Sequence, residues 1–186
     1  MSLYLRNNNF SGSIPRFSKL KNLFFLELGG NKLTGSIPDF ADLPELNSVW
    51  LYKNQLSGPI PNTPFIKWFH YWNNNFTFSD ILASGKTSPT YYYYPQNEFF
   101  VDTTIQTLKN APVSIDLKID PNLKDSKYYL FYNHDGIQTL VGISDSNKIV
   151  FAKPQFSDAG RYQVQVINPQ LPKLGLYSKT ISLRVC

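Results

Sequence analysis

The chain is almost without cysteine: its one cysteine among 186 residues is Cys186, the last residue. A single thiol cannot close an intrachain disulfide, and it cannot supply a cysteine-based zinc site. Charged residues are also few, at 17%, and no apolar run approaches the roughly 18 residues of a membrane span. These absences exclude a disulfide-stapled scaffold and predict no membrane span in this chain.

The basic residues do not cluster. There are 18 Lys and Arg against 13 Asp and Glu, a formal net charge of +5, but the surplus is spread along the whole sequence. Nucleic-acid-binding proteins normally carry a basic stripe or patch. We therefore expect no nucleic-acid partner.

The residue patterns of catalytic sites are missing as well. One of the two histidines, His134, lies beside Asp135 in a predicted turn, where a solvated ring is the ordinary outcome. No phosphate-binding loop, nucleophile elbow or metal-ligand spacing is present. The sequence predicts a protein that is not an enzyme and that needs no cofactor or metal.

Aromatic residues and proline are plentiful. Aromatics make up 16% of the chain, and there are 13 prolines, which break helices. This composition favours strands and turns, so we expect a mostly β protein.

The first part of the chain is a repeat. The pattern Leu-x-Leu-x-x-Asn-x-Leu-x-Gly-x-Ile-Pro occupies residues 3–15, 26–38 and 49–61, with Val49 and Phe10 as the apolar variants, so that its asparagine recurs every 23 residues. A shortened fourth copy covers residues 69–76, where the asparagine follows after 20. Four aligned copies indicate a solenoid, in which each repeat buries its leucines against its neighbours.

These copies resemble the leucine-rich repeat, and the Gly-x-Ile-Pro ending resembles the subtype found in plant receptors and some bacterial surface proteins. The resemblance covers residues 1–82 and implies a parallel sheet. Because the chain enters in mid-repeat at Met1, we expect further repeats upstream.

The fixed polar positions of the repeat have structural explanations. An amide side chain can donate to and accept from backbone groups that the corner after each strand leaves unpaired. The glycines are expected to adopt positive φ. The asparagines expected to have this structural role are Asn8, Asn31, Asn54 and Asn74.

The second part of the chain predicts a separate antiparallel sandwich over residues 96–186, after a junction at 83–95 rich in turn formers and tyrosine. Apolar and polar residues alternate from Val113 to Asp120, an Asp-Gly turn follows His134, and residues 180–185 form the expected last strand.

The stretch from Ser157 to Val164 resembles the tyrosine corner of immunoglobulin domains, with Tyr162 as the corner residue. In that family the tyrosine hydroxyl bonds back to the backbone upstream. The cysteines and the core tryptophan of the family are absent, so the resemblance implies an immunoglobulin-like domain of the disulfide-free kind. A fibronectin-like sandwich is the alternative.

The strands of the repeats carry a candidate binding surface. In the leucine-rich family, the positions between and beside the leucines line a concave face that binds ligands, and all three tryptophans of this chain fall there. Clustered aromatics on a face expected to be polar suggest recognition, although packing of Trp68 and Trp72 as a cap is the alternative. The expected ligand-binding residues are Tyr4, Arg6, Phe25, Glu27, Trp50, Tyr52, Trp68, His70 and Trp72.

We therefore predict an extracellular or cell-surface recognition module that binds a protein or carbohydrate through the concave face of its repeats. The alternatives are a structural spacer and an accessory region of a larger secreted enzyme.

Overall fold

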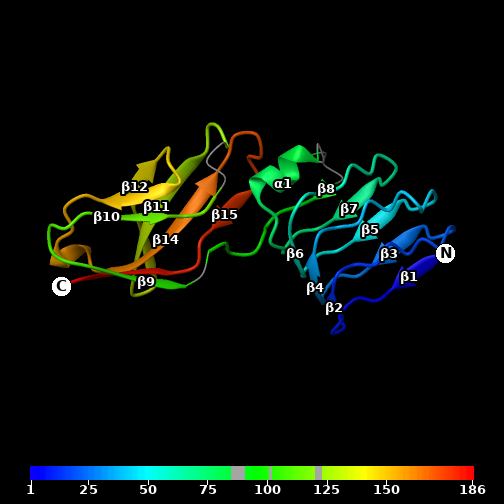
Figure 1. Cartoon of the computed structure of the whole chain (residues 1–186), viewed down its shortest axis with the longest axis horizontal. Coiled ribbons are helices and arrows are strands. Elements are labelled where there is room, and N and C mark those ends of the chain that lie inside the picture. Colours follow the sequence, from blue (N-terminus) through cyan, green and yellow to red (C-terminus); the bar gives the residue numbers. More distant parts are fainter. Residues whose placement is uncertain (85–90, 101, 120–122) are drawn as a thin grey trace. The chain divides into compact units, whose positions relative to one another are not determined.

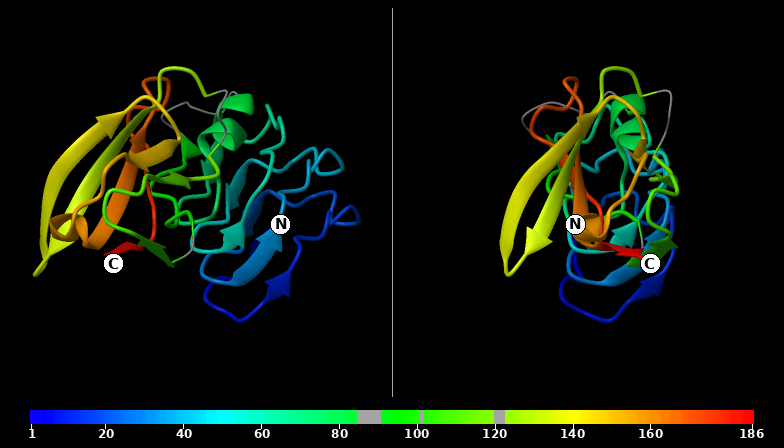
Figure 2. Two further views of the ribbon diagram at one scale, coloured as in Figure 1. Left: turned by 60° about the vertical axis from the view of Figure 1, so that its left-hand side comes forward. Right: turned by 90° about the vertical axis from the view of Figure 1, so that its left-hand side faces the viewer.

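A computed structural model of the chain describes residues 1–84, 91–100, 102–119 and 123–186. They form two compact units, Met1–Asn97 and Glu98–Cys186 (Figures 1 and 2). Strands dominate both units, which confirms the prediction of a mostly β protein.

The first unit is built on a parallel sheet of five short strands in chain order (Figure 1). Their apolar side chains alternate, so that one face of the sheet packs into a dry core; Leu26, Val49 and Phe69 are fully buried there. Successive strands pair in register, with Leu26 beside Leu3 and Val49 beside Leu26. The strands are β1 (Ser2–Tyr4), β3 (Phe25–Glu27), β5 (Ser48–Trp50), β7 (Trp68–His70) and β8 (Tyr91–Tyr92).

A second, smaller parallel sheet follows the corner of each of the first three repeats. The regular spacing of glycine serves this corner, because Gly12, Gly35 and Gly58 have φ values of 82°, 77° and 84°, a region that favours glycine. The expected positive φ is thereby confirmed. The strands are β2 (Ser11–Gly12), β4 (Lys32–Gly35) and β6 (Gln55–Leu56).

The repeat asparagines tie neighbouring turns together. Asn54 donates from Nδ2 to the carbonyls of Leu28 and Leu51, each at 3.0 Å, and its Oδ1 accepts the amide of Leu33 at 3.0 Å. Asn31 and Asn74 repeat this pattern one turn before and one turn after. Each buried amide therefore satisfies backbone groups of two adjacent repeats.

A fifth turn extends the solenoid beyond the four copies recognised in the sequence. Strand β8 pairs with β7, so that Tyr91 lies beside Phe69, and Gln96 takes the place of the asparagine. Gln96 accepts the amide of Asn74 at Oε1 and donates from Nε2 to the carbonyls of Tyr71 and Tyr93. The tyrosines that we read as a junction thus belong to the first unit; of that predicted junction, residues 85–90 lie outside the described residues.

A short helix, α1 (Phe78–Ala83), follows the fourth corner. It begins at a capping box, in which the Thr77 hydroxyl accepts the amide of Asp80 and the Asp80 carboxylate accepts the amide of Thr77. Phe78 and Ile81 bury its inner face. The sequence analysis did not anticipate this helix.

The second unit contains a six-stranded sheet in the order β12-β11-β14-β16-β9, with β15 beside β14, and a two-stranded sheet of β10 and β13. The pairs are antiparallel except for β9 with β16. The strands are β9 (Thr103–Thr107), β10 (Val113–Asp116), β11 (Lys127–His134), β12 (Ile137–Ser144), β13 (Lys148–Phe151), β14 (Gly160–Ile167), β15 (Gly175–Tyr177) and β16 (Ile181–Val185).

Local sequence signals account for much of this unit. Strands β11 and β12 form a hairpin around Asp135 and Gly136, which have φ values of 49° and 80°, as expected of an Asp-Gly turn. Alternation buries Tyr162, Val164 and Val166 on one face of β14. The predicted hairpin and the predicted last strand are confirmed.

A 3-10 turn, η1 (Phe156–Asp158), leads into β14. From the start of that strand, the Tyr162 hydroxyl donates to the Asp158 carbonyl at 2.6 Å. The backbone oxygen therefore has a partner although the ring that covers it is buried.

Reducing agent is expected to leave the melting temperature of the monomer unchanged, because Cys186 is a free, exposed thiol and one cysteine closes no loop. Differential scanning calorimetry of purified monomer with and without reductant checks this. A lower melting temperature in reductant would contradict it.

Candidate functional site

One face of the five-stranded sheet packs into the core, and the opposite face, here called the open face, carries aromatic side chains. Ring contacts cross all five strands without a break, with centroid separations of 5.1, 5.1, 4.9 and 4.4 Å. The spacing follows from the pairing, since neighbouring strands lie about 4.8 Å apart. We call this line the ring ladder; its members are Tyr4, Phe25, Trp50, His70 and Tyr92.

Within the ring ladder, both flanks of Trp50 are occupied. Phe25, from β3, meets it edge to face at 5.1 Å, and His70, from β7, stacks on it at an interplanar angle of 13°. Burial lowers the pKa of His70 below its ordinary value, so the imidazole is neutral at pH 7. The indole Nε1 of Trp50 is buried without a hydrogen-bond partner among the described residues.

A second aromatic column runs beside the ring ladder. Tyr52 and Trp72 stack with centroids 4.9 Å apart and an interplanar angle of 7°, and Lys53 Nζ lies 5.5 Å from the Trp72 ring centroid. On its other side, Tyr52 packs over Gly29, where an added Cβ would lie 2.5 Å from the tyrosine Cζ. Glycine at position 29 therefore makes room for the ring.

The sequence analysis expected Glu27 to contact a ligand, but its carboxylate is not accessible on the open face. It is only 3% exposed; its Oε1 accepts the Tyr52 hydroxyl at 3.1 Å and lies 3.7 Å from an Arg6 guanidinium nitrogen. Through this hydrogen bond, the Glu27 carboxylate fixes the orientation of the Tyr52 side chain. Burial, followed by the bond to Glu27, raises the pKa of Tyr52, which keeps that hydroxyl protonated.

Trp68 differs from the other tryptophans. Trp68 is 47% exposed, and its ring contacts no other aromatic ring among the described residues. It forms one wall of a shallow cavity of about 360 Å³ on the open face. The cavity is lined by Ser48, Trp50, Trp68, His70 and Tyr92.

The strand pairing brings most of the sequence-predicted residues onto the open face. Tyr4, Glu27, Trp50 and His70 occupy one column, as strand register requires. Tyr92 continues that column but was missed, because the tyrosine run was read as a junction. Its spacing in Tyr91-x-Tyr93-x-x-Gln96 was the available signal.

Two findings bear on other kinds of site. Across the described ranges, no three His, Cys, Asp or Glu side chains gather closely enough to hold a metal ion. The only α-helix described, α1, is too short to cross a membrane.

Comparison with known proteins adds support for the solenoid. The leucine-rich repeat family model matches residues 1–20. An internalin-like protein of Listeria monocytogenes has a similar structure, with a TM-score of 0.58 and 21% identity over 100% of this chain and 57% of that chain. This chain therefore spans little more than half of that protein.

The extracellular domain of the voltage-gated sodium channel beta4 subunit also matches, with 19% identity over 48% of this chain and 96% of that one, but its TM-score of 0.35 is too low to establish a shared fold. No curated protein matches the chain by sequence. The family-model match over residues 1–20, the internalin-like neighbour and the parallel sheet together support a leucine-rich-repeat fold for the first unit.

Proposed function

We propose that this chain is a recognition module of a secreted or cell-surface protein, and that it binds a protein partner through the open face of its repeats. The observation that carries the proposal is the ring ladder with the cavity at Trp68. A continuous aromatic surface that is exposed on a folded sheet has large contact area and little side-chain entropy to lose on binding.

The orientation of the rings favours a protein over a carbohydrate. A sugar stacks on the face of a ring, but His70 stacks on one face of Trp50 and Tyr52 stacks on one face of Trp72. This stacking reduces the ring face that the two tryptophans can offer to a sugar, whereas a protein partner can also use ring edges, which are electropositive and suit carbonyl groups and other aromatic rings. Trp68 supplies the one tryptophan that is free of ring contacts in the described part of the chain.

The second unit fits an immunoglobulin-like domain, which we include in the proposal. The Tyr162 hydroxyl bond to Asp158, four residues upstream, supports it, as does the division of the unit into a larger sheet and a separate pair of strands, β10 and β13. We likewise assign the repeats to the Gly-x-Ile-Pro subtype and place the protein at the cell surface, where modules of this kind act.

Replacing Trp68 by alanine tests the binding face. We expect a loss of about 2 kcal/mol, roughly thirty-fold in the dissociation constant, because an aromatic at the centre of an interface contributes this much. Binding is measured with the whole chain on an array of extracellular proteins and on a glycan array. Phe156→Ala is the matched control, since it removes an exposed ring from the second unit.

Three outcomes separate the possibilities. Protein binding that is lost in Trp68→Ala and kept in Phe156→Ala supports the proposal. Binding to glycans alone would show that the ligand of the open face is a carbohydrate and not a protein. Binding that survives Trp68→Ala undiminished would exclude the open face as the site.

A further inference from the structure

The cavity beside Trp68 lies at a gap in a column of large side chains. Strand pairing places Ser48 between Phe25 and Trp68 on the open face, at the first position of three successive strands. The small serine side chain cannot fill the space that a ring fills in the strands on either side. The Phe25 ring contacts Trp50 instead, and an opening of about 360 Å³ remains, with Ser48 in its lining.

The lining of this cavity is aromatic and carries no positive charge. Four of its five residues are Trp50, Trp68, His70 and Tyr92, and the fifth is Ser48. The face of an aromatic ring is its electronegative side. Because burial lowers the pKa of His70, its imidazole is uncharged at pH 7. The cavity therefore offers aromatic surface to a cation and no charge that would repel it.

The polar groups of the lining suit an occupant that donates hydrogen bonds. The hydroxyls of Ser48 and Tyr92 and the unprotonated nitrogen of His70 can each accept one. An apolar occupant would leave those acceptors that it covers without a partner, which costs free energy. A guanidinium has several N–H donors and no acceptor, and its flat surface stacks on aromatic rings. Arginine thus matches both the rings and the acceptors.

Trp68 is the tryptophan of the open face that remains available to a cation from outside. Trp72 already has a cation of the chain beside it, since Lys53 Nζ lies 5.5 Å from its ring centroid. That distance is within the range of about 6 Å in which a cation and a ring attract each other. No ring or cation of the described residues lies over Trp68, and Lys67, which precedes it in the chain, is not part of the cavity lining.

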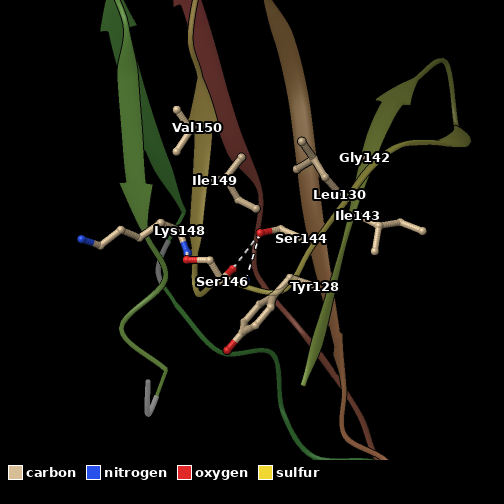
Figure 3. Close-up of a pocket in the computed structure, with 9 residues that line it drawn as sticks. All are labelled: Tyr128, Leu130, Gly142, Ile143, Ser144, Ser146, Lys148, Ile149 and Val150. Carbon is tan, nitrogen blue, oxygen red and sulfur yellow. Dashed lines mark hydrogen bonds between the residues drawn. The ribbon is translucent and has the colours of Figure 1, made fainter. Parts of the chain in front are cut away.

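A cavity of similar size in the second unit lacks these features. It measures about 370 Å³ and is lined by residues of β11, β12 and β13 (Figure 3). Leu130, Ile143, Ile149 and Val150 make its lining mainly aliphatic, and Lys148 extends its ammonium away from them (Figure 3). Aliphatic walls do not distinguish one apolar occupant from another, whereas the aromatic walls and acceptors beside Trp68 select a cation that donates hydrogen bonds.

We propose that the cavity beside Trp68 is a binding site for an arginine side chain of the protein partner, and that Ser48 determines this specificity because its small side chain keeps the cavity open. The inference rests on the proposed function of the open face and adds which group of the partner enters it. The guanidinium lies against Trp68 and donates to the acceptors of the lining. The positive net charge of the chain is spread along its sequence and is screened at physiological salt, so the local lining decides which group binds.

Two-dimensional NMR of the whole, isotope-labelled chain tests the proposal with small probes. The probes are N-acetyl-arginine amide, its neutral isostere N-acetyl-citrulline amide, and N-acetyl-phenylalanine amide. We expect the arginine probe to bind with a millimolar dissociation constant, about five-fold tighter than the citrulline probe, because a cation–ring contact adds this much. It should shift the indole N–H signals of Trp50 and Trp68, which line the cavity, and leave that of Trp72 unchanged. The amide signals of Ile143 and Ile149, in the aliphatic cavity, should also stay in place.

Ser48→Phe closes the cavity without removing a ring from its wall. The change should be tolerated, because the neighbouring strands carry Phe25 and Trp68 at the same position, and the arginine probe should no longer shift the Trp68 indole signal. Tyr4→Ser is the matched control. Tyr4 is a 65% exposed member of the ring ladder that lies outside the cavity, so this variant should bind the arginine probe like the wild-type chain. Circular dichroism verifies that both variants are folded; if Ser48→Phe is not, the probe comparison on the wild-type chain decides.

Three results would each overturn the proposal. They are equal binding of the arginine and citrulline probes, tighter binding of the phenylalanine probe, and undiminished arginine binding by a folded Ser48→Phe chain. These results are independent of the protein array. A protein that binds the array-tested chain through Trp68 while the two isosteric probes bind equally would keep the proposed function and exclude arginine as the group that enters. Selective arginine binding with no protein partner on the array would keep the cavity's preference and count against the proposed function.

Discussion

Asn54→Ala is expected to destabilise the first unit by about 3–5 kcal/mol. The substitution removes three buried hydrogen bonds of 3.0 Å, to the carbonyls of Leu28 and Leu51 and from the amide of Leu33. Alanine fills none of these roles, and each buried backbone group left unpaired costs about 1–3 kcal/mol. Because the bonds join two repeats, the loss affects the interface that holds the solenoid together.

Asn8→Ala is the matched control. Asn8 has the same place in its repeat, but it is exposed, and its Nδ2 bonds to Leu5 and Arg6 are replaced by water at little cost. We expect a change below about 1 kcal/mol. Tryptophan fluorescence during urea unfolding measures both variants selectively, because all three tryptophans of the chain lie in the first unit. Equal losses for the two variants would show that the bonds between repeats do not hold the solenoid.

The regular part of the solenoid was predictable because it depends on a repeated local pattern. The spacing of the leucines fixed which side of each strand is buried, and the glycine positions fixed the corners, as the φ of Gly35 shows. The open face followed from the same spacing, since residues between buried leucines must point the other way. The same repeat spacing places Tyr4, Glu27 and Trp50 in one column, which the strand pairing confirms.

The fifth turn was not predictable from the leucine pattern, because it uses other residues for the same tasks. Tyr93 is buried where a leucine is expected, and Gln96 reaches the carbonyl of Tyr71 that an asparagine would otherwise take. Helix α1 was not predicted because its capping signal, Thr77 to Asp80, lies in the repeat segment and no long apolar helical pattern follows it.

The burial of Glu27 was also beyond sequence reasoning. Strand periodicity places its side chain on the open face, as observed, but the neighbours that cover it come from other repeats. Tyr52 lies 25 residues further along the chain, in the next repeat, and Arg6 lies in the preceding repeat. Such cover depends on side-chain lengths and rotamers, which the repeat pattern does not encode.

Tyr162→Phe is expected to destabilise the second unit by about 1–3 kcal/mol and to leave the first unit unchanged. The hydroxyl donates to the Asp158 carbonyl at 2.6 Å from a buried ring, and phenylalanine would leave that acceptor unpaired. Tyr177→Phe is the control, because the Tyr177 hydroxyl bonds to Gln165 at 2.7 Å on an exposed surface. We expect the control to change stability by less than about 0.5 kcal/mol.

The pH dependence of the Tyr162 effect gives a second check. Burial, with a contribution from the Asp158 charge, raises the pKa of Tyr162 from 10.0 to about 12. The folded state therefore holds this proton more tightly than the unfolded state. The stabilisation is fully present below pH 10 and is lost as the pH rises towards 12. The difference in the free energy of unfolding between the wild-type chain and Tyr162→Phe should accordingly narrow over that range. Urea unfolding followed by far-ultraviolet circular dichroism, together with tryptophan fluorescence for the first unit, measures this difference in the free energy of unfolding.

A difference below about 0.5 kcal/mol at pH 8 between the wild-type chain and Tyr162→Phe would mean that Tyr162 does not hold the turn into β14. The immunoglobulin-like assignment would then lose its main support.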